Sequence, residues 1–260
     1  MNPSSASRPA LAAATADAAT QTPKVLLHEH LDGGLRPSTL HELLQARGLA
    51  APASDADSLA QWFDGRAQAG SLERYLEGFA LTVPAMAEPA ALARVAFEAA
   101  EDARADGVVL AEFRIAPLLF EAHGLDGDDA VAALLEGLSR SALASGLIVC
   151  GMRQEDEANT LRAARLALRW MGRGVVGFDL AGPERGFPPA RHAAALALVR
   201  EAGLPITLHA GEADSGERVL EAARLGARRI GHGVRLADLL AAPRGESVLA
   251  EVADLSLIHI

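Results

Sequence analysis

Short apolar runs alternate with amphipathic segments along this 260-residue chain, and several of the apolar runs end in histidine. The runs are often β-branched, as is typical of strands buried on both faces. They cover Val25–Leu31, Val108–Arg114, Leu147–Gly151, Val175–Leu180, Ile206–His209 and Arg229–His232. Helices are predicted over Thr39–Arg47, Ala90–Ala105, Asp128–Leu143, Asn159–Trp170 and Pro189–Glu201. Strands that alternate with helices favour an α/β fold with a parallel sheet. The pattern indicates a TIM-type (β/α)8 barrel that is incomplete, with about six of its eight strands.

The chain divides into one domain and two short ends. Residues 1–22 contain mostly Ala, Ser, Thr and Pro and are expected to be a disordered tail, without the basic start of a secretory signal. Residues 23–254 are expected to form the partial barrel. Residues 49–85 form a long insertion with four aromatic side chains, which are expected either to cover a pocket or to form a small separate core.

Charge and cysteine content exclude several classes of function. The net charge is −10 and no basic run is present, so nucleic acid and membrane partners are not expected. Cys150 is the only cysteine, which leaves no intrachain disulfide and no cysteine-based zinc site, and fits a cytoplasmic protein. No apolar run reaches the roughly 18 residues of a membrane helix.

The histidines at the ends of predicted strands suggest a metal site. His28 and His30 lie two apart on a strand, so their side chains leave the same face, and Glu29 points the other way. Such a pair alone is weak support, because most core histidines only satisfy hydrogen bonds. His209 and His232 end two further strands, and a turn at Gly211 brings Glu212 towards the same end. Small neighbours of His232 are expected to leave room for a ligand. We expect the remaining four histidines to be solvated, partly packed or in loops: His41, His123, His192 and His259.

Five segments together resemble the adenosine deaminase family of metal-dependent hydrolases. They occur in the family's order, at Lys24–Gly34, Ala111–Pro117, Gly177–Glu184, Thr207–Glu212 and Arg229–Gly233. The resemblance extends from about residue 24 to about residue 253. It implies a barrel enzyme that deaminates adenosine and 2′-deoxyadenosine to inosine and ammonia in purine salvage, with one Zn²⁺ per chain.

The same resemblance implies a role for each matching residue. His28, His30 and His209 would bind the zinc, and His30 would also lie beside the substrate. Glu212 would protonate N1 of the purine, and His232 would orient the attacking hydroxide and help to take its proton. In the substrate pocket, the Gly182 N–H would donate to N3 and Asp32 would hold the 5′-hydroxyl of the ribose. Asp32 and the segment at Asp179–Gly182 favour a nucleoside over adenine or AMP.

The end of the sequence departs from the family pattern. In the family, an aspartate ligand and a neighbouring aspartate come from the last strand, and no residue here obviously replaces them; Asp254 lies too early. Residues 255–260 match the translation of a transposon end used in library preparation and are expected to be a non-native tail. We therefore expect a piece of a longer gene whose 260-residue product turns over adenosine poorly.

Two alternatives remain open. The first is a metal hydrolase on the same barrel that acts on another aminopurine such as adenine. Lys24 is the only lysine, so a carbamylated-lysine binuclear centre is not available to it. The second alternative is a fragment that binds zinc or purine without turnover. The oligomeric state is not determined by the sequence.

Overall fold

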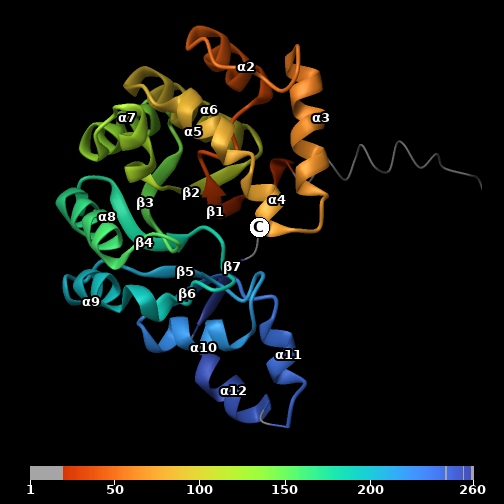
Figure 1. Ribbon diagram of the computed structural model, residues 1–260. Coiled ribbons are helices and arrows are strands. Elements are labelled where there is room, and N and C mark those ends of the chain that lie inside the picture. Colours follow the sequence, from red (N-terminus) through yellow and green to blue (C-terminus); the bar gives the residue numbers. More distant parts are fainter. Residues whose placement is uncertain (1–19, 244, 254, 259–260) are drawn as a thin grey trace, which may run out of the picture.

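Parallel strands form the centre of the molecule and helices cover their outer side (Figure 1). The computed structural model describes residues 20–243, 245–253 and 255–258. The strands are β1 Lys24–His30, β2 Val108–Ile115, β3 Ala144–Met152, β4 Val175–Ala181, β5 Thr207–Ala210, β6 Arg229–His232 and β7 Ser256–Ile258. They pair in the orders β1-β2-β3-β4 and β5-β6-β7, and each pair is parallel.

One bridge joins the two groups of strands. Phe178 on β4 pairs in parallel with Ile206, and its N–H donates to Pro205 O at 3.0 Å. The sheet therefore continues from β1 to β7, as in most of a (β/α)8 barrel, which confirms the predicted fold class. Within the described residues, no pairing closes the sheet between β7 and β1.

The structure has a helix in each of the five segments where the sequence predicts one, and three more in the outer layer that the sequence analysis did not predict. Those of the outer layer are α2 Pro37–Ala46, α6 Pro89–Ala105, α7 Gly127–Ser139, α8 Glu157–Trp170, α9 Ala193–Glu201, α10 Glu217–Arg224, α11 Leu236–Leu240 and α12 Gly245–Val252. Two short 3-10 helices, η1 Pro117–His123 and η2 Pro189–His192, also follow strands. Aspartates begin two of the longer helices: Asp126 accepts the N–H of Asp128, and Asp156 accepts that of Asn159. None of the described helices is both long and apolar enough to cross a membrane.

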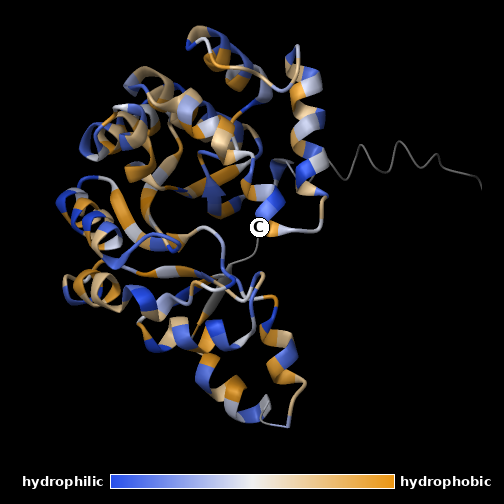
Figure 2. Cartoon of the chain, viewed as in Figure 1, coloured by the Kyte–Doolittle hydropathy of each residue, from blue (hydrophilic) through white to orange (hydrophobic). Residues whose placement is uncertain are grey.

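The main core lies between the sheet and these helices. Figure 2 shows apolar residues concentrated on the strands and on the inner faces of the helices, with polar residues outside. Phe113, Phe178 and Leu208 are fully buried on three different strands. Burial of this apolar surface is the main force that holds the helices against the sheet.

The insertion of residues 49–85 was expected either to cover a pocket or to form a small separate core, and the structure shows both. The insertion forms α3 Ala56–Ala67, α4 Leu72–Leu76 and α5 Phe79–Met86. Leu59 of α3 packs with Leu40 and Leu44 of α2 in a small separate core. Tyr75 and Phe79, by contrast, line the cavity at the carboxyl ends of the strands.

The structure has one more strand than the six predicted. β7 pairs with β6 from Arg229↔Ser256 to Gly231↔Ile258, within the segment expected to be a non-native tail. An exposed strand edge offers unpaired N–H and C=O groups, so a short run that follows it can add to the sheet. The origin of residues 255–260 stays a prediction. The predictions for residues 1–19, Asp254 and His259 concern positions outside the described residues.

Candidate metal centre

A large cavity opens at the carboxyl ends of the strands, where barrel enzymes place their active sites. Its volume is about 1320 Å³. Every site residue predicted from the sequence except His28 lines it: His30, Asp32, Gly182, His209, Glu212 and His232. His28 is 3% exposed and lies against His209.

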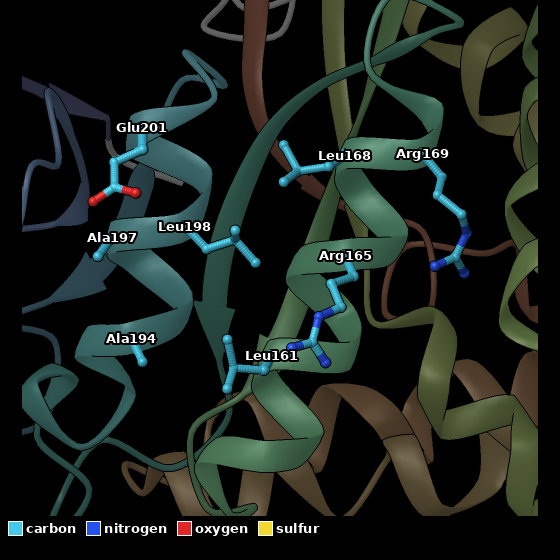
Figure 3. Close-up of a pocket in the computed structure, with 8 residues that line it drawn as sticks. All are labelled: Leu161, Arg165, Leu168, Arg169, Ala194, Ala197, Leu198 and Glu201. Carbon is cyan, nitrogen blue, oxygen red and sulfur yellow. The ribbon is translucent and has the colours of Figure 1, made fainter.

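A second hollow, of about 730 Å³, lies outside the barrel between α8 and α9. Leu161 of α8 and Leu198 of α9 face each other across it (Figure 3). Its charged side chains are Arg165, Arg169 and Glu201, and it contains no histidine or cysteine. The histidines and acids predicted as site residues therefore lie at the cavity inside the barrel and not at this hollow.

Three imidazoles meet at the base of that cavity. Nε2 of His209 lies 2.9 Å from Nε2 of His28 and 3.0 Å from Nε2 of His30. Burial lowers the pKa of His28 and of His30 well below the ordinary value, so both rings are neutral at pH 7. A tetrahedral zinc with Zn–N bonds of about 2.0–2.1 Å would hold its nitrogens roughly 3.4 Å apart. Nε2 of His28 and Nε2 of His30 each lie a few tenths of an ångström closer to Nε2 of His209 than a shared zinc would hold them.

The fourth imidazole, that of His232, completes this cluster. Nitrogens of His28, His209 and His232 lie within 4.8 Å of one another. His232 has φ 71°, and it is the only non-glycine residue with a positive φ in the described part of the chain. Such a conformation costs of order 1–3 kcal/mol and persists where the surroundings fix it. It turns the ring from the end of β6 towards the other histidines.

Two glycines leave space for side chains of β1. A Cβ at Gly231 would lie 2.6 Å from Cε1 of His28, so this glycine makes room for His28. In the sequence analysis, the small neighbours of His232 were instead expected to leave room for a ligand beside His232. A Cβ at Gly34 would lie 1.9 Å from Oε1 of Glu29, whose side chain packs against the turn after β1. The pairing of β1 with β2 shifts register between Leu26 and Glu29, which places this irregularity beside the histidines.

Asp179, a buried carboxylate of β4, orients His209. Its Oδ2 lies 2.8 Å from Nδ1 of His209 and accepts from Nη1 of Arg114 at 2.6 Å. Arg114 also donates to Leu27 O of β1 at 2.7 Å. Burial alone would raise the pKa of Asp179, but His209 and Arg114 hold it far below the ordinary value. A carboxylate on the outer nitrogen of a histidine fixes the ring and strengthens it as a ligand.

Sequence reasoning missed this pair, although a signal was present. Asp179 and Arg114 each lie within an otherwise apolar strand, and a charge buried in that way needs an opposite charge nearby. Which two strands would bring them together could not be determined from the sequence.

Glu212 and Asp32 are acids in the wall of the cavity. Burial raises the pKa of Glu212 above its ordinary value, against the opposing effect of His209, so that the proton is retained to higher pH. Oε2 of Glu212 lies 3.5 Å from Nε2 of His232. Burial raises the pKa of Asp32 to about 7, and its Oδ1 has no hydrogen-bond partner within the protein. Both carboxyls are therefore available to a ligand.

Gly182 also lines this cavity. Its φ is +97°, and a Cβ there would lie 2.4 Å from Oε1 of Gln154. A glycine is therefore required for the backbone to lie open at this edge of the cavity. Six of the seven residues predicted as catalytic, metal-binding or substrate-binding line one cavity, and the seventh, His28, contacts His209 beside it.

His192 corrects an expectation from the sequence. It was expected to be solvated or partly packed, but it is fully buried, and its Nε2 lies 2.9 Å from Arg153 O. Arg153 is also fully buried and donates through Nη2 to Leu180 O and His209 O. Both side chains support the ends of β4 and β5, which explains their burial. His41 is only partly buried, as expected.

Comparison with known proteins agrees with this geometry. The model of the adenosine deaminase family matches residues 23–259. An adenosine deaminase from Mycobacterium marinum is 45% identical over 251 residues, which cover 92% of this chain and 69% of that protein. Among the curated relatives, the chain spans between 62% and 69% of their length.

Solved structures show the same fold. An amidohydrolase from Burkholderia ambifaria with bound zinc has a TM-score of 0.79 at 28% identity, over 88% of this chain and 63% of that chain. An adenine deaminase from Arthrobacter aurescens has a TM-score of 0.74 at 23% identity, over 88% of this chain and 73% of that chain. At this identity, the second similarity concerns the fold alone.

Proposed function

The chain belongs to the adenosine deaminase family, and we propose that it carries the metal centre and the proton-donating acid of a cytoplasmic adenosine deaminase. The reaction is the hydrolysis of adenosine, or of 2′-deoxyadenosine, to the inosine nucleoside and ammonia in purine salvage. At C6 of the purine, a bond to oxygen forms and the bond to the amino nitrogen breaks. The main support is the convergence of three imidazole nitrogens with a carboxyl group, that of Glu212, whose pKa is raised by burial, at one cavity.

His28, His30 and His209 would hold one zinc ion per chain. When bound, zinc lowers the pKa of a coordinated water to about 7 and so supplies a nucleophile at neutral pH. The protein's own groups do the rest. His232 takes up the proton of the attacking water from the side of β6, and Glu212 donates its proton to N1 as negative charge builds there.

The same cavity offers contacts for the rest of a nucleoside. The N–H of Gly182 donates to N3 of the purine, and Asp32 accepts from the 5′-hydroxyl of the ribose. His30 lies between the metal position and Asp32, with its Nδ1 4.0 Å from Asp32 Oδ1. Tyr75 and Phe79 belong to the insertion and line the cavity, where they would cover the purine ring.

The charge of the lining favours a nucleoside over a nucleotide. Four residues with carboxyl groups line the cavity, namely Asp32, Glu73, Glu77 and Glu212. Only two arginines do so, Arg185 and Arg235. Even with Glu212 protonated, Glu73 and Glu77 offset the charge of the two arginines, so the lining offers a phosphate no net positive charge. Adenine is disfavoured for another reason, since it has no hydroxyl for the unpartnered Oδ1 of Asp32.

A second candidate is zinc and purine binding without turnover by the 260 residues alone. The one metal-binding group found among the described residues contains histidines and no carboxylate. Because the chain spans about two thirds of its relatives, the activity of the whole protein is part of the proposal.

The experiment compares four substrates by absorbance: adenosine, 2′-deoxyadenosine, adenine and AMP. It uses the zinc-loaded 260-residue chain and the product of the full open reading frame at the same locus. We expect the longer product to convert only the two nucleosides, and its Glu212→Gln variant to bind zinc normally but turn over at least about 10²-fold more slowly. Conversion of adenine or AMP at the rate of adenosine would contradict the assigned substrate. Zinc and inosine binding without turnover by the 260-residue chain would establish the second candidate for that chain.

A further inference from the structure

A single buried carboxylate, that of Glu184, holds the turn that follows β5. Glu184 is 1% exposed and lies in the loop after β4. Its Oε1 accepts the N–H of Gly211 at 2.6 Å. Its Oε2 accepts the next three N–H groups, those of Glu212, Ala213 and Asp214, at 3.0, 2.7 and 2.8 Å. Four consecutive backbone donors thus end on one side chain.

Further bonds join the same two loops. Nε of the neighbouring Arg185 donates to Ala213 O at 2.7 Å. The loop after β4 also closes on itself, where the N–H of Phe187 donates to Glu184 O at 3.1 Å. Below them, Arg153 bonds to Leu180 O and His209 O, the ends of β4 and β5. The loop after β4 and the turn after β5 are therefore joined by several side-chain bonds.

These two segments carry the two groups proposed to bind the six-membered ring of the purine. Gly182 lies in the loop after β4, and Glu212 in the turn after β5. N1 and N3 belong to one rigid ring, so their partners must keep a fixed separation. No helix or strand includes residues 211–216, and Gly211 has φ +67°. The shape of the turn consequently depends on side-chain bonds, and bonds to a charged acceptor are about twice as strong as neutral ones.

We infer that Glu184 is a positioning residue that fixes the Glu212 turn against the Gly182 loop and so sets the separation of the two purine contacts. This inference rests on the proposed function. A misplacement of about 1 Å at a catalytic group can cost roughly 10²-fold in rate. Glu184 faces backbone N–H groups on the side of the turn and does not line the cavity, so its effect passes through Glu212.

Glu184→Gln tests the clamp with little change in side-chain size. In the parent, Oε1 of Glu184 accepts one backbone N–H and Oε2 accepts three. Whichever oxygen the amide NH₂ of glutamine replaces, that NH₂ is itself a donor and cannot accept those backbone N–H groups. The matched control is Glu157→Gln: Glu157 is exposed, and its Oε1 accepts a single backbone N–H, from Ala194, on the outer layer. Hydrogen exchange is measured on residues 211–214 of the zinc-loaded 260-residue chain. We expect at least tenfold faster exchange in Glu184→Gln and no change in Glu157→Gln; equal exchange in both variants would overturn the clamp.

The functional arm follows inosine affinity by calorimetry and adenosine turnover in the product of the full open reading frame. We expect Glu184→Gln to lose about tenfold in inosine affinity and about 10²-fold in kcat, at unchanged zinc content. Faster exchange with affinity and kcat within twofold of the parent would overturn the positioning role. If Glu184→Gln does not fold, Arg185→Ala, at an exposed side chain, must still speed exchange at residue 213 and lower kcat, or the inference fails. A parent that neither binds inosine nor deaminates adenosine would refute the proposed function, and the exchange result would then decide on the clamp alone.

Discussion

Gly231→Ala should weaken metal binding although residue 231 has no side chain to bind a metal. The added Cβ would lie 2.6 Å from Cε1 and 3.2 Å from Nδ1 of His28. An ordinary contact begins at 3.4 Å, so the imidazole must retreat by about 0.8 Å. Gly231 is not among the glycines with positive φ, so alanine fits the backbone and the clash alone is tested.

The retreat of the ring sets the magnitude of the effect. Nε2 of His28 lies 2.9 Å from Nε2 of His209, and a shared zinc would hold the two roughly 3.4 Å apart, so a retreat of about 0.8 Å exceeds the adjustment that coordination needs. Groups that merely orient metal ligands are worth about 10–100-fold in metal affinity. We expect a loss of that size in zinc affinity, or about 1.4–2.7 kcal/mol, measured by competition with a chelator.

Gly65→Ala provides the control. Gly65 lies within α3, and a Cβ there meets nothing within 4 Å. This alanine should leave zinc affinity unchanged and stabilise the chain by up to about 1 kcal/mol through helix propensity. If Gly231→Ala kept zinc affinity within threefold of the parent while circular dichroism showed a native fold, the proposed role of His28 as a ligand would be refuted.

Three further predictions follow from the site. Asp179→Asn should lower zinc affinity about 10–100-fold and destabilise the chain by about 3–5 kcal/mol in urea unfolding, because Arg114 loses its buried partner; a loss below 1 kcal/mol would contradict that pairing. Since burial raises the pKa of Glu212, the acid form persists to higher pH, and kcat/KM should fall as pH rises through that pKa; a rate that rises there would exclude Glu212 as the acid. His232→Gly should be about 1 kcal/mol more stable than His232→Ala, because only glycine relieves the positive φ, and equal urea midpoints would show that no strain is stored.

Much of the fold and the site could be predicted from local sequence. The alternation of apolar strands with helices identified the parallel sheet, because each element carries its own periodicity. A two-residue spacing was enough to place His28 and His30 on one face of β1. Glycine in the turn before Glu212, and histidine at the ends of β5 and β6, predicted that these side chains would gather at one end of the sheet, where they line one cavity.

Only the tertiary structure determined which distant groups meet. His28 and His209 are separated by 181 residues, yet their Nε2 atoms lie 2.9 Å apart. The pairing of Asp179 with Arg114, the space that Gly231 leaves for His28, and the four bonds to Glu184 likewise join separate strands or loops. Periodicity fixes the direction of a side chain within its own strand. The distance between strands depends on how the whole sheet curves and packs, which no local pattern encodes.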